Sequence, residues 1–194
     1  MTTNTTHMHS EIEEIPSAIN RLIEHSEDAI IKAAAEIREF NPTVFTTVAR
    51  GSSDHASAYL KYAIELSAGI PVASIGPSIS SIYNTKLNLK NAVNISISQS
   101  GKSPDIVDLT KTAGEGGALN IAITNVATSP LAQESAHTLD IQAGLEKSVA
   151  ATKTFVTSIV AGLLLIAHWQ RDDALLAAIK KLPEQAGLAV KVDW

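Results

Sequence analysis

Residues 92–105 read AVNISISQSGKSPD, an apolar and β-branched run, a small polar loop and a proline that suits the first position of a helix. The run predicts a strand over residues 92–98, and the loop at residues 99–103 opens a helix at Pro104. A strand followed by a short loop and a helix is half of a βαβ unit. This stretch therefore indicates an α/β fold with a parallel sheet.

The same alternation recurs on both sides of this stretch. Upstream strands are expected at residues 43–49 and 71–75, and downstream strands at residues 118–124 and 137–141. The central runs are almost continuously apolar, as expected when helices cover both faces of a parallel sheet. We predict a doubly wound, five-stranded parallel sheet in three α/β/α layers, with the flavodoxin-like strand arrangement.

Helical patterns occupy much of the remaining chain. Two helices are expected before the first strand, at residues 10–25 and 26–40, and Pro16 suggests a break or a new first turn. The later helices are predicted at residues 55–68, at residues 78–83, from Pro104 onward, at residues 150–169, and after Arg171 and Pro183.

The composition excludes several classes of protein. The 194 residues are 45% hydrophobic, which suffices for one sizeable globular core. The 15 lysines and arginines face 20 aspartates and glutamates and form no long basic block, so we expect no nucleic-acid partner and no membrane partner. Cysteine is absent, which excludes a disulfide scaffold, a thiolate nucleophile and a cysteine-based zinc site.

Cofactor and targeting motifs are missing as well. The chain has neither the Gly-x-Gly-x-x-Gly fingerprint nor a P-loop, and its histidines have no metal-ligand spacing, so we expect no cofactor and no metal. The start of the chain is polar, unlike a secretory signal. The apolar stretch at residues 155–169 is shorter than the roughly 18 to 20 residues of a membrane span. We therefore expect a cytoplasmic protein.

The loop after the strand at residues 92–98 carries the strongest signal for a ligand. Ser103 can cap the following helix, and Gly101 lets the loop turn tightly. The hydroxyls of Ser98, Ser100 and Ser103 would then converge with free backbone amides, and a helix N-terminus with several free donors binds phosphate readily. Alternatively, Ser103 only caps its helix and the other serines only turn the chain.

A second loop of similar character follows the strand at residues 43–49. It contains Gly51, Ser52 and Ser53, and its strand should neighbour the strand that precedes the first loop. Two such loops side by side predict a pocket for a small anion. Arg50 either adds a phosphate contact or pairs with an acidic residue at the surface, and the sequence leaves both open.

A third loop, at residues 143–153, leads into the long helix. Glu146, Lys147 and Lys153 are candidates for positioning a polyol or for orienting a neighbouring chain. Alternatively, the two lysines are solvated and Thr152 packs in the first turn of the helix.

At three segments the chain resembles the SIS (sugar isomerase) family of phosphosugar-binding domains. These segments are RGSSDHA at residues 50–56, SQSGKSPD at residues 98–105 and EKSVAATK at residues 146–153. The resemblance covers about residues 43–169. Within the family, the chain is most similar to the isomerase part of glucosamine-6-phosphate synthase and to glucosamine-6-phosphate deaminases.

The resemblance implies which residues meet a ligand. The residues that would hold the phosphate of a 6-phosphosugar are Ser98, Gln99, Ser100, Ser103 and Ser53. The residues that would meet the sugar are Gly51, Ser52, Val149 and Ala150, together with Ser53. The implied ligand is a phosphorylated hexose or hexosamine.

Enzymes of this kind resemble two SIS lobes in tandem, which implies a division of this chain. It consists of N-terminal helices at residues 1–42, one SIS phosphosugar-binding domain at residues 43–170, and trailing helices at residues 171–194 that are expected to link to an absent second lobe. The catalytic groups of the family have no counterpart here, so we expect this lobe alone to be inactive.

For the parent protein, the resemblance implies an amino sugar 6-phosphate isomerase or deaminase that interconverts glucosamine 6-phosphate and fructose 6-phosphate. One alternative is a non-catalytic phosphosugar-sensing regulatory module. A plainer alternative is a stable sheet domain whose loops hold no specific ligand.

The apolar stretch at residues 155–168 bears on association. It is richer in large aliphatic residues than one helix face needs, which predicts a homodimer. The alternative is that this helix is buried within its own lobe.

Overall fold

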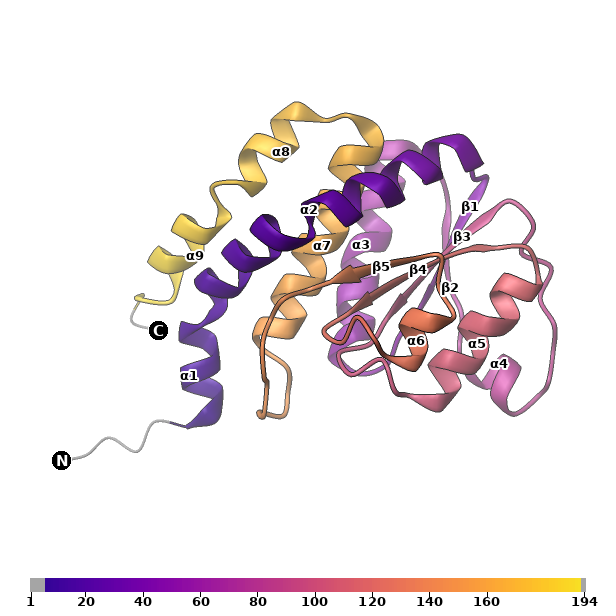
Figure 1. The fold of residues 1–194 in the computed structure, drawn as a ribbon, viewed down its shortest axis with the longest axis horizontal. Coiled ribbons are helices and arrows are strands. Elements are labelled where there is room, and N and C mark those ends of the chain that lie inside the picture. The colour runs from indigo at the N-terminus through magenta and orange to yellow at the C-terminus, as the bar shows by residue number, and fades with distance from the viewer. Residues whose placement is uncertain (1–5, 193–194) are drawn as a thin grey trace.

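The computed structural model describes residues 6–192 and contains the predicted sheet (Figure 1). In this part of the chain the strands are β1 (Val44–Val48), β2 (Val72–Ser74), β3 (Ala92–Ile97), β4 (Leu119–Thr124) and β5 (His137–Asp140). They pair in parallel, in the order β2-β1-β3-β4-β5. The doubly wound, five-stranded parallel sheet and its flavodoxin-like order are confirmed.

Helices cover both faces of the sheet and complete the three predicted layers. The helices are α1 (His7–Glu13), α2 (Ile15–Phe40), α3 (Ser52–Ala68), α4 (Ser78–Ser81), α5 (Pro104–Glu115), α6 (Pro130–Gln133), α7 (Lys153–Gln170), α8 (Asp173–Ile179) and α9 (Leu182–Ala189). Helices α2, α3 and α7 lie on one face of the sheet, and α4, α5 and α6 lie on the other (Figure 1).

Each face of the sheet has its own core. Phe45 packs with Leu60 of α3 and Leu164 of α7 in a cluster that also includes apolar side chains of α2. On the opposite face, Val48 packs with Leu109 of α5. Successive strand residues point to opposite faces, so nearly continuous apolar strands supply both cores.

A row of buried polar side chains crosses the sheet on the α5 face. Thr46 of β1, Asn94 of β3 and Asn120 of β4 lie opposite one another in the strand pairing. The Thr46 hydroxyl donates to Oδ1 of Asn94 at 2.9 Å, and Nδ2 of Asn94 donates to Oδ1 of Asn120 at 3.1 Å. These bonds form only in this register, so the row opposes a one-residue slip of β3 against its neighbours.

The N-terminal helices differ from the prediction. Helix α2 runs without interruption through His25 and Ser26, where the sequence predicts a boundary between two helices. That boundary is wrong, because the Ser26 side chain is buried and its hydroxyl donates to the carbonyl oxygen of Asp140 at 2.6 Å. Pro16 does lie in the first turn of α2, as predicted.

Two further helix predictions differ from the structure. The short helix α6 was not predicted, although Ser129 caps it and Pro130 occupies its first turn. Helix α7 begins at Lys153 rather than at Ala150. Among the described residues, no helix combines the length and the apolar character that a membrane crossing requires.

Candidate functional site

The loop after β3 turns sharply at Gly101. This glycine has a φ of +61°, and a Cβ atom built on it would lie 2.1 Å from Oγ of Ser129. Two internal hydrogen bonds also hold the loop. The Gly101 N–H donates to Oγ of Ser98 at 3.2 Å, and the Lys102 N–H donates to Oγ of Ser100 at 3.3 Å. The turn therefore requires glycine on grounds of both conformation and space.

Ser103 occupies the N-cap position of α5, and Pro104 follows it in the first turn. The Ser103 side chain accepts no hydrogen bond from the first turn of α5, so the predicted capping bond is absent. Ser103 lines a cavity in front of the helix. The first backbone N–H groups of a helix have no intrahelical partners, so donors gather at this point.

The loop after β1 lies beside this loop. Gly51, with a φ of +58°, is the N-cap residue of α3, and Ser52 and Ser53 begin that helix. The Arg50 guanidinium pairs with the Asp105 carboxylate in the first turn of α5. Of the two roles open to Arg50, the structure contains the acidic pair, which joins the loop after β1 to the start of α5.

The two loops enclose a cavity of about 190 Å³. Its lining residues are Arg50, Ser53, Ile97, Ser98, Gln99, Ser100, Ser103 and Ile106. All five residues predicted to hold phosphate are among them. Because the cavity is smaller than the roughly 300–1,000 Å³ of typical drug-sized sites, its volume suits a small group.

Among the residues predicted to meet the sugar, Ser53 lines this cavity and the other four lie outside its lining. Gly51 and Ser52 flank it at the start of α3. Val149 and Ala150 belong to the segment between β5 and α7, and the Val149 side chain is 96% exposed. The structure therefore gathers the predicted phosphate residues but does not gather all of the predicted sugar residues with them.

The charged residues of the segment before α7 lie in different surroundings. Lys153 is only 1% exposed and pairs through Nζ with Glu14, so it is not a solvated lysine. Glu146 accepts hydrogen bonds from the N–H and the hydroxyl of Thr152, the N-cap residue of α7, both at 3.1 Å. Both groups are therefore engaged within this chain, and only Lys147 is exposed.

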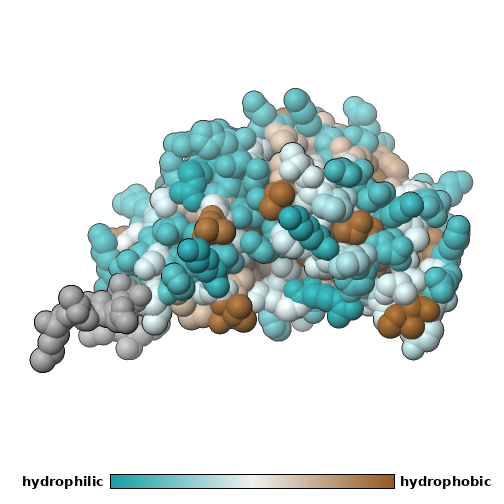
Figure 2. Space-filling view, turned by 60° about the horizontal axis from the view of Figure 1, so that its bottom comes forward, coloured by the Kyte–Doolittle hydropathy of each residue, from teal (hydrophilic) through white to brown (hydrophobic). Residues whose placement is uncertain are grey.

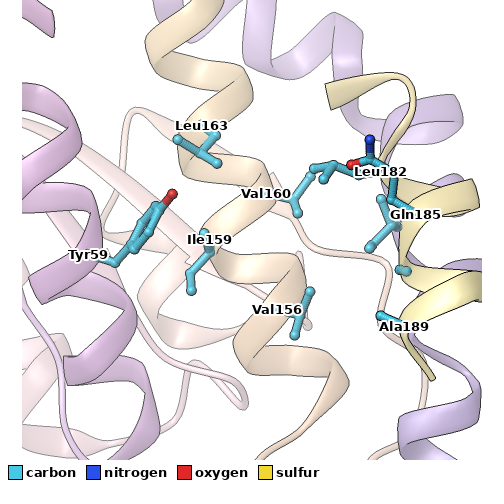
Figure 3. Close-up of a pocket in the computed structure, with 10 residues that line it drawn as sticks. Tyr59, Val156, Ile159, Val160, Leu163, Leu182, Gln185 and Ala189 are labelled. Atoms are coloured by element: carbon cyan, nitrogen blue, oxygen red, sulfur yellow. The ribbon is translucent and has the colours of Figure 1, made fainter. Parts of the chain in front are cut away.

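A second cavity, of about 400 Å³, lies between α2, α3, α7 and α9 and was not predicted (Figure 3). We call it the apolar groove. Tyr59, Val156, Ile159, Leu163 and Leu182 line it, and Gln185 adds the side-chain amide on its rim. Its lining residues include no lysine, arginine or histidine, so the groove offers no charge to an anion.

The described residues include no cluster of three histidine, cysteine, aspartate or glutamate side chains suited to a metal ion. Figure 2 brings the lower side of Figure 1 forward, where the segment before α7 lies, and hydrophilic side chains dominate that face while hydrophobic ones stand apart. The cavity between the loops after β1 and β3, which we call the polar cavity, is the candidate site for a small anionic ligand.

The fold and the polar cavity together define a class of protein: a flavodoxin-like α/β domain with a small-group pocket where the strand order reverses. The family model of the SIS domain matches residues 44–168. This chain belongs to the SIS domain family.

Two relatives in sequence are longer than this chain. The glutamine–fructose-6-phosphate aminotransferase (isomerizing) of Symbiobacterium thermophilum is 33% identical over 173 residues, which cover 83% of this chain and 27% of that protein. The enzyme of the same name from Pseudomonas aeruginosa is 33% identical over 205 residues, covering 96% of this chain and 33% of that protein. The chain therefore spans about a third or less of the length of these relatives.

Two solved structures are also similar to this chain. A protein from Silicibacter pomeroyi DSS-3, assigned as a phosphosugar isomerase, is 55% identical with a TM-score of 0.96, over 98% of this chain and 58% of that one. The C-terminal domain of glucosamine-fructose-6-phosphate aminotransferase from Francisella tularensis is 26% identical with a TM-score of 0.77, over 96% of this chain and 55% of that one. The chain is an SIS domain related to phosphosugar isomerases and to these aminotransferases.

Replacing Gly101 by alanine should destabilise the domain. The positive φ and the contact with Ser129 should together lower the free energy of unfolding by about 1–3 kcal/mol, measured by urea denaturation. Gly187→Ala is the matched control, because Gly187 lies in helix α9 and an added Cβ atom would meet nothing within 4 Å. Its stability should stay unchanged or rise by up to about 1 kcal/mol. Equal stability of the two variants would contradict the role given to Gly101.

Proposed function

We propose that this chain binds a hexose or hexosamine 6-phosphate and holds the phosphate in the cavity between the loops after β1 and β3. The phosphate ligands would be Ser53, Ser98, Gln99, Ser100 and Ser103. The single observation that carries this proposal is that these five residues, from two separate segments, line one small cavity. Hydroxyls and free amides at helix N-termini are donors that bind a phosphate group readily.

The sugar would extend from this cavity toward the neighbouring loops. Gly51 and Ser52 flank the cavity, and Val149 and Ala150 would line the far side of the sugar. The names of the relatives support this class of ligand, since they include an aminotransferase of fructose 6-phosphate and a protein assigned as a phosphosugar isomerase.

We further propose that the parent protein is an isomerase or deaminase of amino sugar 6-phosphates, with this chain as one lobe. Moving a proton between C1 and C2 of the open sugar requires a positioned base. The lining of the polar cavity contains no carboxylate and no imidazole, so its residues would anchor and orient the ligand. We therefore expect the isolated chain to bind glucosamine 6-phosphate or fructose 6-phosphate without converting either one.

The apolar groove supports a proposed homodimer, although helix α7 itself is mostly buried within its own lobe. Beside the groove, α3 exposes Tyr59, Tyr62 and Leu66 by 50%, 66% and 84%. Residues three and four apart share one face of a helix, so these side chains form one apolar stripe. A contiguous apolar surface of this kind is typical of protein interfaces, and a second copy of the chain would cover it.

Thermal shift measurements test the proposed ligand. At a ligand concentration of about 100 Kd, glucosamine 6-phosphate or fructose 6-phosphate should raise Tm by about 5–10 °C, and the unphosphorylated sugars should not. The double variant Ser98→Ala with Ser103→Ala should lose this shift, because it removes two hydroxyls of the cavity. The control is Ser67→Ala with Ser81→Ala, at exposed positions. Equal shifts from unphosphorylated sugars, or a full shift in the first double variant, would refute the proposal.

Light scattering tests the proposed dimer. The wild-type chain should have twice the mass of one chain, and Tyr62→Glu with Leu66→Glu should be monomeric because two charges would enter the apolar stripe. Tyr83→Glu is the control, since Tyr83 is 73% exposed and follows α4 on the opposite side of the sheet. A monomeric wild-type chain would exclude this interface. A dimeric variant with Tyr62→Glu and Leu66→Glu would exclude it as well.

A further inference from the structure

Three carboxylates hold the irregular segment between β5 and α7. Glu146 belongs to the segment and closes it on itself, with the N–H groups of Thr152 and Thr154 donating to its Oε1, each at 3.1 Å. The other two carboxylates, Glu11 and Glu14, come from the N-terminal end of the chain. Helix α1 and the segment lie side by side in Figure 1.

Glu11 attaches the first half of the segment to α1. Its carboxylate accepts hydrogen bonds from the N–H of Lys147, from the N–H of Ser148 at 3.1 Å, and from the Ser148 hydroxyl. Glu11 is the buried residue of α1, at 5% exposure. Burying a carboxylate is unfavourable unless hydrogen bonds compensate it, and here three donors of the segment do so.

The ionised form of Glu11 is favoured at this place. The hydrogen bond from the Ser148 hydroxyl is the largest influence and lowers the pKa of the carboxyl below its ordinary value of 4.5. Burial acts in the opposite direction, and the backbone N–H groups of Lys147 and Ser148 and the charge of Lys153 lower the pKa further. The contact is therefore a set of charge-assisted hydrogen bonds at neutral pH.

Glu14 attaches the start of α7, directly after the segment. Nζ of Lys153, the first residue of α7, pairs with its carboxylate, and the Lys153 side chain is almost fully buried. Glu11 and Glu14 are three residues apart at the junction of α1 and α2, so they face the same side. Both ends of the stretch from Ser148 to Lys153 are thus held by one short part of the chain.

The first two residues after Ser148 are open to solvent, whereas Ala151 and Thr152 are half-buried. Val149 is 96% exposed, and Ala150 is exposed beside it. An apolar residue that packs against nothing has no contact of its own to keep it in place, so its position depends on its neighbours. A ligand contact is preorganised when the residues that make it are exposed and the chain on both sides of them is fixed. Val149 and Ala150 meet this description.

We infer that Glu11 is a positioning residue, which holds Val149 and Ala150 through Ser148 at the place where the sugar of a 6-phosphosugar is bound. This inference rests on the proposed function and extends it to helix α1, outside the residues that the family model matches. Glu11 does not line the polar cavity, so its effect should reach the sugar and not the phosphate.

Calorimetric titration of the full chain with fructose 6-phosphate and with inorganic phosphate separates these effects. Glu11→Gln keeps the shape of the side chain but removes its charge, and Ser148→Ala removes the hydroxyl on the other side of the contact. Each variant should bind fructose 6-phosphate about 5- to 20-fold more weakly and inorganic phosphate less than about twofold more weakly. Faster hydrogen exchange at the Lys147 and Ser148 amides should accompany the loss.

Glu13→Gln is the matched control, because Glu13 is exposed on the same helix and should leave both affinities unchanged. Unchanged fructose 6-phosphate affinity in Glu11→Gln and Ser148→Ala would overturn the inference and leave the proposed function intact. Equal weakening for both ligands would also overturn it, since that result indicates a general structural role. If the wild-type chain binds neither ligand, the proposed function fails and the inference fails with it.

Discussion

The parallel pairing of β1 with β3 determines where this domain can bind a ligand. Val48 lies opposite Ser96 in that pairing, so the loops after the two strands leave the sheet side by side. The strand order reverses between β1 and β3, and the crossovers therefore diverge and leave the space between the loops open. Helices α3 and α5 begin at these loops, and the first N–H groups of a helix have no partners within the helix.

Polar and apolar recognition occur at separate places on the molecule. Four serines and one glutamine are among the residues that line the small cavity at the loops, and Arg50, which also lines it, is already paired with Asp105. A phosphate there would be held chiefly by directed neutral donors, which agrees with a chain whose net charge is −5. The apolar groove lies at α2, α3, α7 and α9, and it suits a protein surface rather than an anion.

The sequence predicts some parts of this structure better than others. Buried parallel strands such as β3 are apolar runs, so local patterns were enough to find them. The residues predicted to hold phosphate lie in two short segments, and the structure brings them to one cavity. The boundary predicted at Ser26 failed because its hydroxyl bonds to Asp140, a partner far along the chain. The burial of Lys153 was missed for the same reason, since its partner Glu14 is 139 residues away. Local sequence patterns carry no information about such pairs.

The proposed function depends on the two loops gripping one phosphate group together. A crystal structure of the chain with fructose 6-phosphate tests this most directly. We expect phosphate oxygens at hydrogen-bond distance, about 2.5–3.0 Å, from the hydroxyls of Ser98, Ser100 and Ser103, with Ser53 closing the site from the other loop. A phosphate bound away from these loops, or contacting only one of them, would contradict this assignment.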